Sequence, residues 1–467
     1  MKLRLIPAEY DYLNDVQDIP RAFVPFIEID GEADSHLRWS CRYSDGKFVC
    51  SIESDVFGNA EKSFEISDSD ISVYKKFTKR FIKNFLYDFL SEKLGKNLPY
   101  GSLTGVRPTK LYYELSERTD NPYEYLIDEF YVEPARAKLV RDCVKNQKGY
   151  KNCSDDNVAL FVNIPFCPTR CSYCSFISTE IGRVKKEIPI YTESLVKEIE
   201  LSKELVKRAN KKVTSVYVGG GTPPALGAEY LDKVLSTIKE YGVEFTVEAG
   251  RPDVITDEIV DTLLRNNVTR VSVNPQTFKQ ATLDLIGRKH TVEDIYSAYE
   301  KVRGRFDVNM DLIAGLPEES FDDFADSLKK TLDLCPENIT VHTLSLKRGS
   351  VLTLSGAVKE ADGLIKAMGD FAIEKLYEAG YLPYYMYRQK NMADNLENVG
   401  YCLPKKQCVY NVDMMEESIS VVGSGAGAMS KNIGGNRIDR LSDPKGFREY
   451  MDRIDTILRQ KEEFFSF

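Results

Sequence analysis

The pattern of apolar and polar residues changes partway along the chain. From Val158 onward, short apolar runs of strand length alternate with stretches of helical period. Helices are predicted in the intervals, for example over 191–207, 229–241 and 321–334. Strands that alternate with helices pair in parallel through right-handed crossovers, so the pattern predicts an α/β fold, a partial (β/α)6 barrel rather than a full eightfold one. The predicted strands begin at Val158, Val213, Glu244, Arg270, Asp307 and Asn338.

The residues before this region predict a smaller α+β N-terminal domain over 1–150. Residues 23–29 and 47–53 are rich in strand-forming side chains, and Asp45-Gly46 is typical of a hairpin turn. A helix is predicted over 73–95, because phenylalanine recurs there every fourth residue and lysine and arginine fall largely on other positions. The phenylalanines of this stripe are Phe77, Phe81, Phe85 and Phe89.

Two further boundaries follow from composition. A loop over 98–110 precedes helical sequence that continues to about residue 146, and the polar stretch 146–156 predicts a linker to the barrel, which we place at 151–350. We predict that 351–467 is a C-terminal extension that packs on the core. Its predicted elements are a helix near 361–379, a strand near 384–388 and a glycine-rich turn at 423–427.

Composition limits the class of protein. A chain of 467 residues with 42% hydrophobic residues is long enough for two or three domains with sizeable cores. The formal net charge of −9 argues against wholesale nucleic-acid binding. The N-terminus turns polar too soon for a secretory signal, and no apolar run is long enough to span a membrane. We therefore expect a cytoplasmic protein in a reducing compartment.

Three cysteines directly after the first barrel strand carry the most specific signal. Cys167, Cys171 and Cys174 have the spacing C-x3-C-x2-C, which places three soft thiolates on one loop. Such ligands select an iron–sulfur cluster, zinc or Cu(I). A zinc site would want a fourth ligand nearby, but no histidine lies between residues 37 and 289 and the next cysteine is Cys335. We therefore predict a [4Fe-4S] cluster with one iron left open, since closed clusters use four cysteines.

Polar and glycine residues fall at the ends of the following predicted strands, where active sites of such barrels collect. The run Gly219-Gly220-Gly221-Thr222-Pro223 lets backbone groups approach a small ligand, although a plain strand–helix turn would look the same. Four charged or amide residues come after this run. Any one of them alone would be interpreted as a surface or structural residue, but their joint position at strand ends favours ligand binding. These residues are Glu248, Gln276, Arg288 and Asp311. The run 311–317 reads equally well as plain strand termination.

Three other features keep more than one interpretation. The basic helix and the loop Arg107-Pro-Thr-Lys110 form a solvated face, capture a polycarboxylate substrate or contact RNA, in decreasing order of expectation. His290 and His342 are interpreted as structural, because neither has a spaced partner. Cys402 and Cys408 would hold a metal or relay electrons only as a minor alternative, and the remaining cysteines are interpreted as buried or incidental thiols.

Taken in order, these motifs resemble one known family. Phe166-Cys-x3-Cys-x-Tyr-Cys, the Gly219–Pro223 run, Glu248, Gln276 and Asp311-Leu-Ile-x-Gly-Leu-Pro are similar to the oxygen-independent coproporphyrinogen III oxidase (dehydrogenase) group of radical S-adenosylmethionine enzymes. The resemblance covers roughly 158–430, and the first domain with Thr104-Gly-Val-Arg-Pro-Thr-Lys is similar to the HemZ-type branch.

The resemblance implies a partial radical S-adenosylmethionine barrel, a [4Fe-4S] cluster on Cys167, Cys171 and Cys174, and S-adenosyl-L-methionine as cosubstrate. The cluster would cleave the cosubstrate to methionine and a 5′-deoxyadenosyl radical, which takes a β-hydrogen from a propionate side chain. Carbon dioxide and one electron then leave, and a vinyl group remains on the tetrapyrrole. It also implies a tetrapyrrole substrate, reduced flavodoxin or ferredoxin as electron donor, and a monomer. The implied contacts to cosubstrate or substrate are Phe161, Tyr173, Phe176, Gly220, Gly221, Thr222, Glu248, Gln276, Arg288 and Asp311.

One position of the cysteine loop favours another branch of the same family. The dehydrogenases carry a further cysteine two residues after the third ligand, where this chain has Phe176, and phenylalanine there is the pattern of the related haem-chaperone branch. The resemblance therefore implies coproporphyrinogen III dehydrogenation to protoporphyrinogen IX as the leading function. A haem-binding chaperone, or radical modification of haem or another anionic substrate, is the alternative.

Overall fold

The computed structural model describes residues 2–7, 16–23, 27–65, 71–105, 107–176, 178–345, 363–389, 395–435 and 437–465. The chain divides into two compact units. Met1–Arg141 and Arg388–Leu396 form the first, and Asp142–Tyr387 and Glu397–Phe467 form the second. The predicted linker at 146–156 therefore lies inside the second unit, because the end of the last N-terminal helix already packs there.

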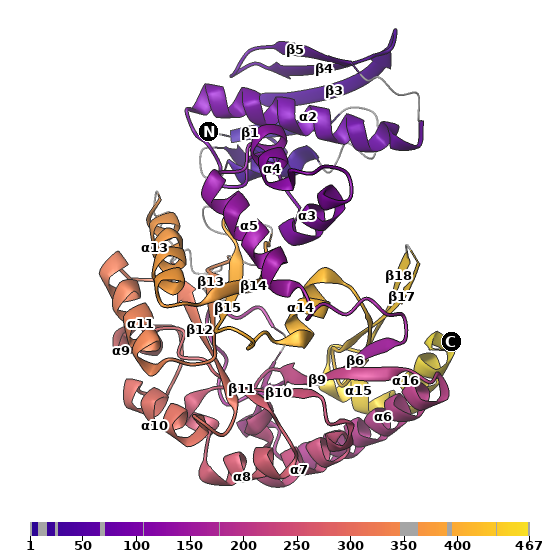
Figure 1. The fold of residues 1–467 in the computed structure, drawn as a ribbon, viewed down its shortest axis with the longest axis vertical. Helices are drawn as coiled ribbons and strands as arrows, with labels where there is room; N and C mark the ends of the chain where they lie inside the picture. The colour runs from indigo at the N-terminus through magenta and orange to yellow at the C-terminus, as the bar shows by residue number, and fades with distance from the viewer. Residues whose placement is uncertain are drawn as a thin grey trace. The chain divides into compact units, whose positions relative to one another are not determined.

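The first unit is built on a sheet with strand order β2-β1-β3-β4-β5 (Figure 1). Asp45 and Gly46 both have positive φ and close the predicted hairpin between β3 and β4. The sheet is mixed, because β1 pairs in parallel with both β2 and β3. Its strands are β1 (Lys2–Pro7), β2 (Glu28–Ile29), β3 (His36–Ser44), β4 (Lys47–Ser54) and β5 (Ala60–Glu65).

The prediction of a strand over 23–29 is confirmed at Glu28–Ile29 but is wrong at Phe23. Phe23 follows the short helix α1 (Asp18–Ala22) and is fully buried, residues 24–26 lie outside the described part, and strand pairing begins only at Glu28. Phe23 and Ile27 thus pack in the core rather than in the sheet, an outcome that apolar content alone does not distinguish from a strand.

The phenylalanine stripe lies on helix α2 (Ile71–Leu94), which crosses one face of this sheet (Figure 1). Phe85 and Phe89 are buried in the core of the unit, and Phe81 stacks on Phe64 of β5. The side chain of Phe77 lies outside the described residues. The stripe thus packs α2 on the inward-facing side chains of β3 and β4, such as Trp39.

Three shorter helices complete the N-terminal part, and each begins with proline. Proline is favoured at the first helical position because its missing N–H needs no partner there. Helix α3 starts at Pro108, so the predicted loop over 98–110 ends three residues early. The helices are α3 (Pro108–Ser116), α4 (Pro122–Phe130) and α5 (Pro134–Gln147).

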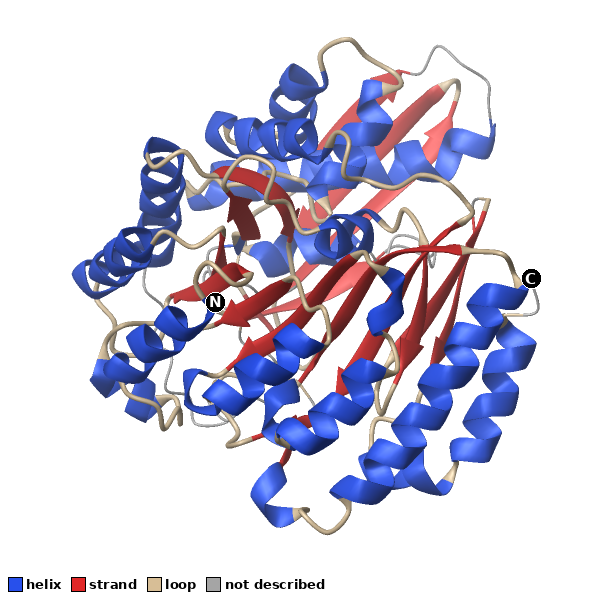
Figure 2. Cartoon of the chain, turned by 60° about the horizontal axis from the view of Figure 1, so that its bottom comes forward, coloured by secondary structure: helices blue, strands red, loops and turns tan. Residues whose placement is uncertain are grey.

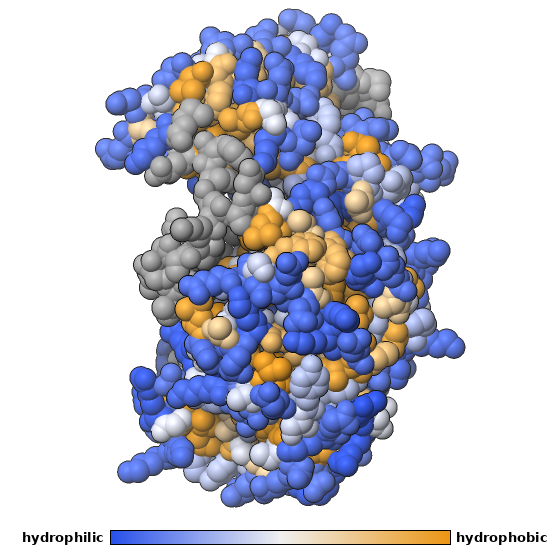
Figure 3. All heavy atoms as spheres, turned by 90° about the vertical axis from the view of Figure 1, so that its left-hand side faces the viewer, coloured by the Kyte–Doolittle hydropathy of each residue, from blue (hydrophilic) through white to orange (hydrophobic). Residues whose placement is uncertain are grey.

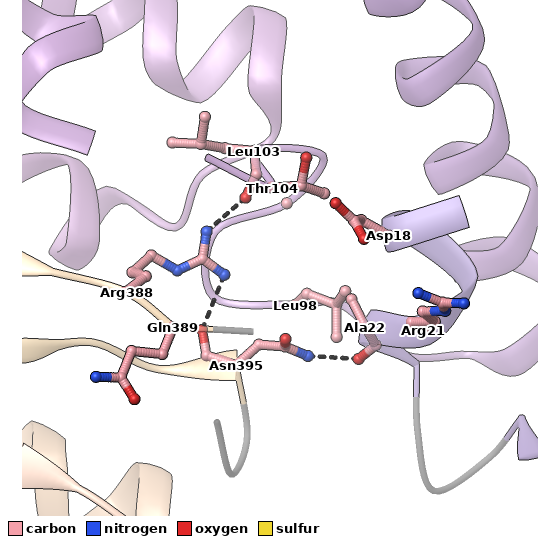
Figure 4. A pocket seen from close by; sticks show the side chains of 10 residues that line it. Asp18, Arg21, Ala22, Leu98, Leu103, Thr104, Arg388, Gln389 and Asn395 are labelled. Atoms are coloured by element: carbon pink, nitrogen blue, oxygen red, sulfur yellow. Dashed lines mark hydrogen bonds between the residues drawn. The ribbon is translucent and has the colours of Figure 1, made fainter. Parts of the chain in front are cut away.

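A small cavity of about 110 Å³ lies in the first unit where the segment Arg388–Leu396 joins it (Figure 4). The Arg388 guanidinium donates to the carbonyls of Leu103 and Asn395, at 2.5 and 3.1 Å, and stacks on the ring of Tyr100. Asn395 in turn donates to the carbonyl of Ala22. These bonds explain why a segment far along the chain belongs to the first unit.

The six predicted barrel strands are present in the second unit and pair in parallel in chain order. Each begins at, or one residue before, the predicted position. The strands are β6 (Asn157–Ile164), β9 (Lys212–Gly220), β10 (Glu244–Gly250), β11 (Arg270–Val273), β12 (Asp307–Ala314) and β13 (Asn338–Thr343).

The C-terminal part extends this sheet at both ends. Beside β13 lie β15 (Asn398–Cys402) and then β14 (Leu382–Tyr387), both antiparallel to their neighbours. Beside β6 lie β16 (Ser420–Ser424), which is parallel to it, and then β17 (Met429–Gly434) and β18 (Arg437–Ser442). In the described residues the result is an 11-stranded sheet that does not close into a full barrel.

Helices cover one face of this sheet, as Figure 2 shows. The opposite face, called the inner face below, carries aromatic side chains. Apolar strand residues such as Leu160 and Val247 pack under the helices. On the opposite face, Phe161 and Tyr217 contact Tyr410 of the short helix α14 (Val409–Glu416). The helices on the first face include α6 (Ile188–Arg208), α7 (Ala228–Ser236), α8 (Asp257–Arg265), α10 (Val292–Val302) and α11 (Phe321–Leu334).

The remaining helices are α9 (Gln280–Leu285), α13 (Leu364–Glu378), α15 (Phe447–Asp452) and α16 (Ile454–Phe464). Among the described helices, none is both long enough and apolar enough to cross a membrane. In the view of Figure 3, polar side chains cover most of the surface and apolar ones form small groups between them.

Candidate functional site

The three cysteines lie on one loop at the carboxyl end of β6. The loop is closed at its base by two-residue strands, β7 (Phe166–Cys167) and β8 (Thr179–Glu180). Inside it, the amide of Cys174 donates to the carbonyl of Cys171 at 3.1 Å. All three thiols are partly exposed, so the loop presents them at the rim of the sheet.

The glycine run at the end of β9 packs directly against this loop. The amide of Thr222 donates to the carbonyl of Phe166 at 2.7 Å, and its hydroxyl lies 3.5 Å from the sulfur of Cys167. A Cβ on Gly221 would come within 2.5 Å of the Phe166 carbonyl oxygen, and one on Gly219 within 2.6 Å of the Glu248 carboxylate. Glycine is therefore required here by close packing.

Glu248 is a buried carboxylate near the end of β10. It accepts hydrogen bonds from the hydroxyl of Tyr217 and, at 3.3 Å, from the amide of Gly220. Burial raises the pKa of Glu248 to about 7, and the negative charge of Asp311 adds to this rise, although the Tyr217 hydrogen bond opposes it. The side chain thus changes charge near neutral pH.

Gln276 and Asp311 are joined across neighbouring strands. Gln276 lies three residues beyond the end of β11 and has a φ of +68°. Its backbone N–H donates to the backbone carbonyl of Asp311 at 2.9 Å. Its side-chain Oε1 is buried and accepts no hydrogen bond from the described residues. This orphaned acceptor is what a ligand's N–H or O–H group would satisfy.

Asp311 itself is held by side chains of β12 and β13. Asn309 donates to it at 2.7 Å, and Nε2 of His342 lies 3.6 Å from its carboxylate. Burial alone would raise the pKa of Asp311, but the hydrogen bond and charge of His342 and the bonds from Asn309 and Thr340 outweigh it, so the pKa is lowered. Asp311 therefore stays ionised, and His342 is part of the site rather than a remote structural group.

Arg288 places a positive charge against the cysteine loop. Its side chain is 5% exposed and donates to the carbonyl of Asn274 and toward Tyr173 and Cys171. Burial would lower the pKa of Arg288, but the adjacent Tyr173 and Cys171 outweigh this and raise it. The guanidinium stays charged, and a cation in this position attracts a carboxylate.

The two predicted phenylalanines have different settings. Phe161 lies on the inner face of the sheet, stacked against Tyr410 at a centroid distance of 6.1 Å. Phe176 follows the third cysteine and is 66% exposed, which is unusual for so large an apolar side chain. Tyr410 was missed by sequence reasoning, because it is far from the motifs in sequence and has no characteristic spacing.

Other cysteines and basic residues lie elsewhere. Cys402 and Cys408 are buried on the inner face with the tyrosines, while Cys153 and Cys335 are exposed. Arg107 and Lys110, the second of which lies in α3, belong to the first unit. Within the described ranges, no group of three or more histidine, cysteine or acidic residues converges on a single metal ion. A four-iron cluster does not require such convergence, because each thiolate binds a different iron.

The donor set therefore fits an iron–sulfur cluster and a small polar ligand. Three soft thiolates share one loop, and buried polar atoms without a hydrogen-bond partner among the described residues lie on the loop and on the strand ends beside it. These atoms are Oγ of Ser172, Oδ1 of Asn274 and Oε1 of Gln276.

Comparison with known proteins decides the family. The Radical SAM superfamily model matches residues 162–331. The chain is 36% identical over 386 residues to the oxygen-independent coproporphyrinogen-III oxidase-like protein HemZ of Bacillus subtilis, covering 78% of this chain and 76% of that protein. The chain belongs to the HemN/HemZ-type radical SAM proteins. Members of the radical SAM family use a [4Fe-4S] cluster and S-adenosylmethionine.

Two further relatives carry different functional names. The haem chaperone HemW of Lactococcus lactis is 30% identical over 316 residues, which cover 66% of this chain and 77% of HemW. The structure of the coproporphyrinogen III oxidase HemN of Escherichia coli superposes with a TM-score of 0.52 at 21% identity, covering 69% of this chain and 73% of HemN. The HemN likeness bears on the fold alone. The family thus contains proteins with oxidase and chaperone names.

Proposed function

We propose that this radical SAM protein is an oxygen-independent coproporphyrinogen III dehydrogenase. It would convert two propionate side chains of coproporphyrinogen III to vinyl groups and so give protoporphyrinogen IX. The single observation that carries the proposal is the arrangement around the cysteine loop. There a buried cation, Arg288, lies beside Cys171, and the carboxylates Glu248 and Asp311 and an orphaned Gln276 acceptor lie on or just beyond the adjacent strands β10, β12 and β11.

In this proposal Cys167, Cys171 and Cys174 hold the cluster and leave one iron for the cosubstrate. When bound, the cluster supplies the electron that generates a 5′-deoxyadenosyl radical from S-adenosylmethionine. The Thr222 hydroxyl, 3.5 Å from Cys167, and the guanidinium of Arg288 beside Cys171 stabilise thiolate charge on this loop.

The remaining residues bind and orient the organic ligands. Glu248 and Gln276 accept hydrogen bonds from hydroxyl or amino groups, and Arg288 pairs with a carboxylate of the cosubstrate or of a propionate. Phe161, Gly220 and Glu248 would contact the cosubstrate. The second cosubstrate or substrate region would comprise Tyr173, Phe176, Gly221, Thr222, Gln276, Arg288 and Asp311.

The partners follow from the same chemistry. Each propionate loses a hydrogen atom to the radical, carbon dioxide to solvent and one electron to an acceptor. Each cleavage of S-adenosylmethionine also consumes one electron from the cluster, so the protein needs an electron source as well as an acceptor. We propose reduced flavodoxin or ferredoxin for this role. The ten cysteines are free thiols, as befits the reducing cytoplasm that we propose as its location.

Product analysis tests the proposal. The reconstituted protein is incubated anaerobically with S-adenosylmethionine, coproporphyrinogen III and a reductant, and tetrapyrroles are separated by chromatography. We expect protoporphyrinogen IX to form together with 5′-deoxyadenosine. Cleavage of S-adenosylmethionine without any new tetrapyrrole would contradict the substrate assignment while leaving the cluster assignment intact.

Haem binding is a second candidate function, and Phe176 favours it. This exposed aromatic side chain next to the third cysteine offers an apolar contact for a flat macrocycle, and several relatives are haem chaperones. Stable haem binding by the anaerobically purified protein, lost in Phe176→Ser and accompanied by no tetrapyrrole turnover, would favour the chaperone. Turnover of coproporphyrinogen would exclude it as the main function.

Cosubstrate binding is expected to depend on pH through Glu248. Because its pKa is raised to about 7, the carboxylate form is lost as the pH falls through that value. If only the ionised form accepts the ligand's hydrogen bonds, the Kd for S-adenosylmethionine rises about tenfold from about pH 8 to about pH 6. Binding by Glu248→Gln should be weaker at the higher pH and nearly independent of pH. A wild-type Kd that is flat across this range would argue against the assigned role.

A further inference from the structure

Arg251 lies in the turn after β10 and its side chain is almost completely buried, with 3% exposure. Asp253 accepts hydrogen bonds from its guanidinium through both carboxylate oxygens. Nε donates to Oδ1 at 2.8 Å and Nη2 donates to Oδ2 at 2.9 Å. This two-point pairing fixes the plane and direction of the guanidinium, which is the geometry in which arginine is most specific.

The remaining terminal nitrogen of Arg251 is directed at the cysteine loop. Nη1 donates to the hydroxyl oxygen of Thr169 at 2.9 Å. Thr169 lies between Cys167 and Cys171, the first two cysteines. Its hydroxyl in turn donates to the carbonyl of Gly287 at 3.1 Å. One hydroxyl thus joins the cysteine loop to the end of β10 and to the turn after α9.

A second bond holds the same loop to the same turn. The amide of Ser172 donates to the carbonyl of Ile286 at 3.0 Å, one residue after Cys171. Gly287 has φ of +76°, and a Cβ there would lie 3.3 Å from the carbonyl oxygen of Arg170, so the two segments are in close contact. Arg288 follows this turn directly. The bonds of the cysteine loop to Ile286 and Gly287 therefore also fix the position of the loop relative to the Arg288 guanidinium.

The charge of Arg251 is balanced where it lies. Burial would raise the pKa of Asp253, but the hydrogen bonds and charge of Arg251 outweigh it and lower the pKa, so the carboxylate stays ionised. His290, fully buried with Nδ1 3.9 Å from Asp253, has its pKa lowered to about 3 by burial and the nearby arginines and is therefore neutral. Arg251 and Asp253 form a neutral pair, so Arg251 acts on the loop by geometry rather than by its field.

We propose that Arg251 is a positioning residue of the cluster site, which acts through Thr169 to hold the first two cysteines in the conformation that retains the cluster. Asp253 orients the guanidinium of Arg251, and the Thr169 hydroxyl links that guanidinium to the cysteine loop. The inference rests on the proposed cluster at Cys167, Cys171 and Cys174 and adds to it a requirement outside the cysteine motif.

A matched pair of substitutions tests the hydroxyl. Thr169→Val removes it with almost no change of shape, and Thr169→Ser keeps it. Each protein is reconstituted anaerobically, and iron release to an excess of chelator is followed by absorbance without cosubstrate or tetrapyrrole. We expect release from Thr169→Val and from Arg251→Gln to be about tenfold faster than from the wild type, because outer partners of metal ligands typically contribute this much to metal retention. Thr169→Ser should stay within about twofold of the wild type.

Two further readouts separate positioning from general stability. The apo form of Thr169→Val should unfold cooperatively at a temperature somewhat below that of Thr169→Ser, because Arg251 and Gly287 each lose a partner. The change that S-adenosylmethionine makes in the electron paramagnetic resonance spectrum of the reduced cluster should be weakened in Thr169→Val and not in Thr169→Ser. If Arg251→Gln does not fold, Asp253→Asn, which leaves Arg251 in place but loosens its orientation, should still release iron faster.

The outcomes distinguish this inference from the function proposed above. Equal iron release from Thr169→Val, Thr169→Ser and a wild type that holds its cluster would overturn the role of Arg251 and leave the dehydrogenase proposal standing. A wild type that binds no cluster would overturn both. A wild type that retains iron as expected but makes no protoporphyrinogen would leave the role of Arg251 intact.

Discussion

Replacing Cys171 by serine is expected to abolish cluster assembly. Serine keeps the size of the side chain but offers a hard oxygen in place of a soft thiolate, and the other two thiols of the loop cannot supply a third anchor. Iron after anaerobic reconstitution should fall from about four atoms per chain to below about one. Formation of 5′-deoxyadenosine from S-adenosylmethionine should fall by more than about 100-fold, beyond the effect of removing an outer partner.

The chain offers its own controls for this substitution. Cys153 and Cys335 are exposed thiols outside the loop, so Cys153→Ser and Cys335→Ser test whether surface cysteines bind iron adventitiously. Both should match the wild type in iron content and in cosubstrate cleavage. A full cluster in Cys171→Ser, or its loss in Cys335→Ser, would show that the three-cysteine loop is not the cluster site.

Replacing Lys461 by methionine is expected to cause the largest loss of stability. Lys461 of α16 and Glu198 of α6 are both fully buried and form an ion pair. Lys461 also donates to the carbonyl of Gly423 in β16, and Glu198 accepts from the amide of Gly425 at 2.8 Å. Removing one partner of a buried pair leaves the other charge uncompensated, so we expect the free energy of unfolding to fall by about 3–5 kcal/mol.

Chemical denaturation of matched variants measures this effect. Glu462 lies next to Lys461 but is exposed, and among the described residues it pairs with Arg208 at 3.5 Å. Glu462→Gln should therefore change the free energy of unfolding by less than about 1 kcal/mol. The double variant Glu198→Gln/Lys461→Met should be more stable than Lys461→Met alone, because no buried charge is then left unpaired. Equal destabilisation by Lys461→Met and Glu462→Gln would refute the structural role of the pair.

The parallel core of the second unit could be predicted from sequence because its signal is local. Each strand is a short apolar run flanked by helical period, and the six observed starts agree with the predicted ones. The same holds for α11, predicted and observed over 321–334, where Ser320 and Asp323 form a capping box. The placement of Glu248 near the end of β10 follows from the same alternation, whereas Asp311 lies within β12 rather than at its end.

The parts that could not be predicted depend on pairings between residues far apart in the chain. Nothing in the sequence near Thr169 indicates that Arg251, 82 positions later, donates to it. The pairing of β16 beside β6 likewise joins segments separated by the whole barrel. Local patterns specify element type, whereas such long-range neighbours are set by the packing of the complete fold.

The site itself shows the same division. The cysteines and the glycine run are motifs with fixed spacing, so they could be located directly. His342 was interpreted as structural because it has no spaced partner, yet its parallel register on β13 brings it against Asp311 on β12. Tyr410 reaches Phe161 only because α14 returns to the inner face of the sheet. Single residues that enter a site from later elements leave no pattern in the sequence.

Mössbauer spectroscopy of the anaerobically reconstituted, iron-57-labelled protein tests the central claim most directly. We expect a four-iron cluster in which one iron becomes distinct from the other three when S-adenosylmethionine is added, because only three thiolates anchor it. A zinc-only protein, or a cluster whose irons all stay alike in the presence of S-adenosylmethionine, would contradict the account.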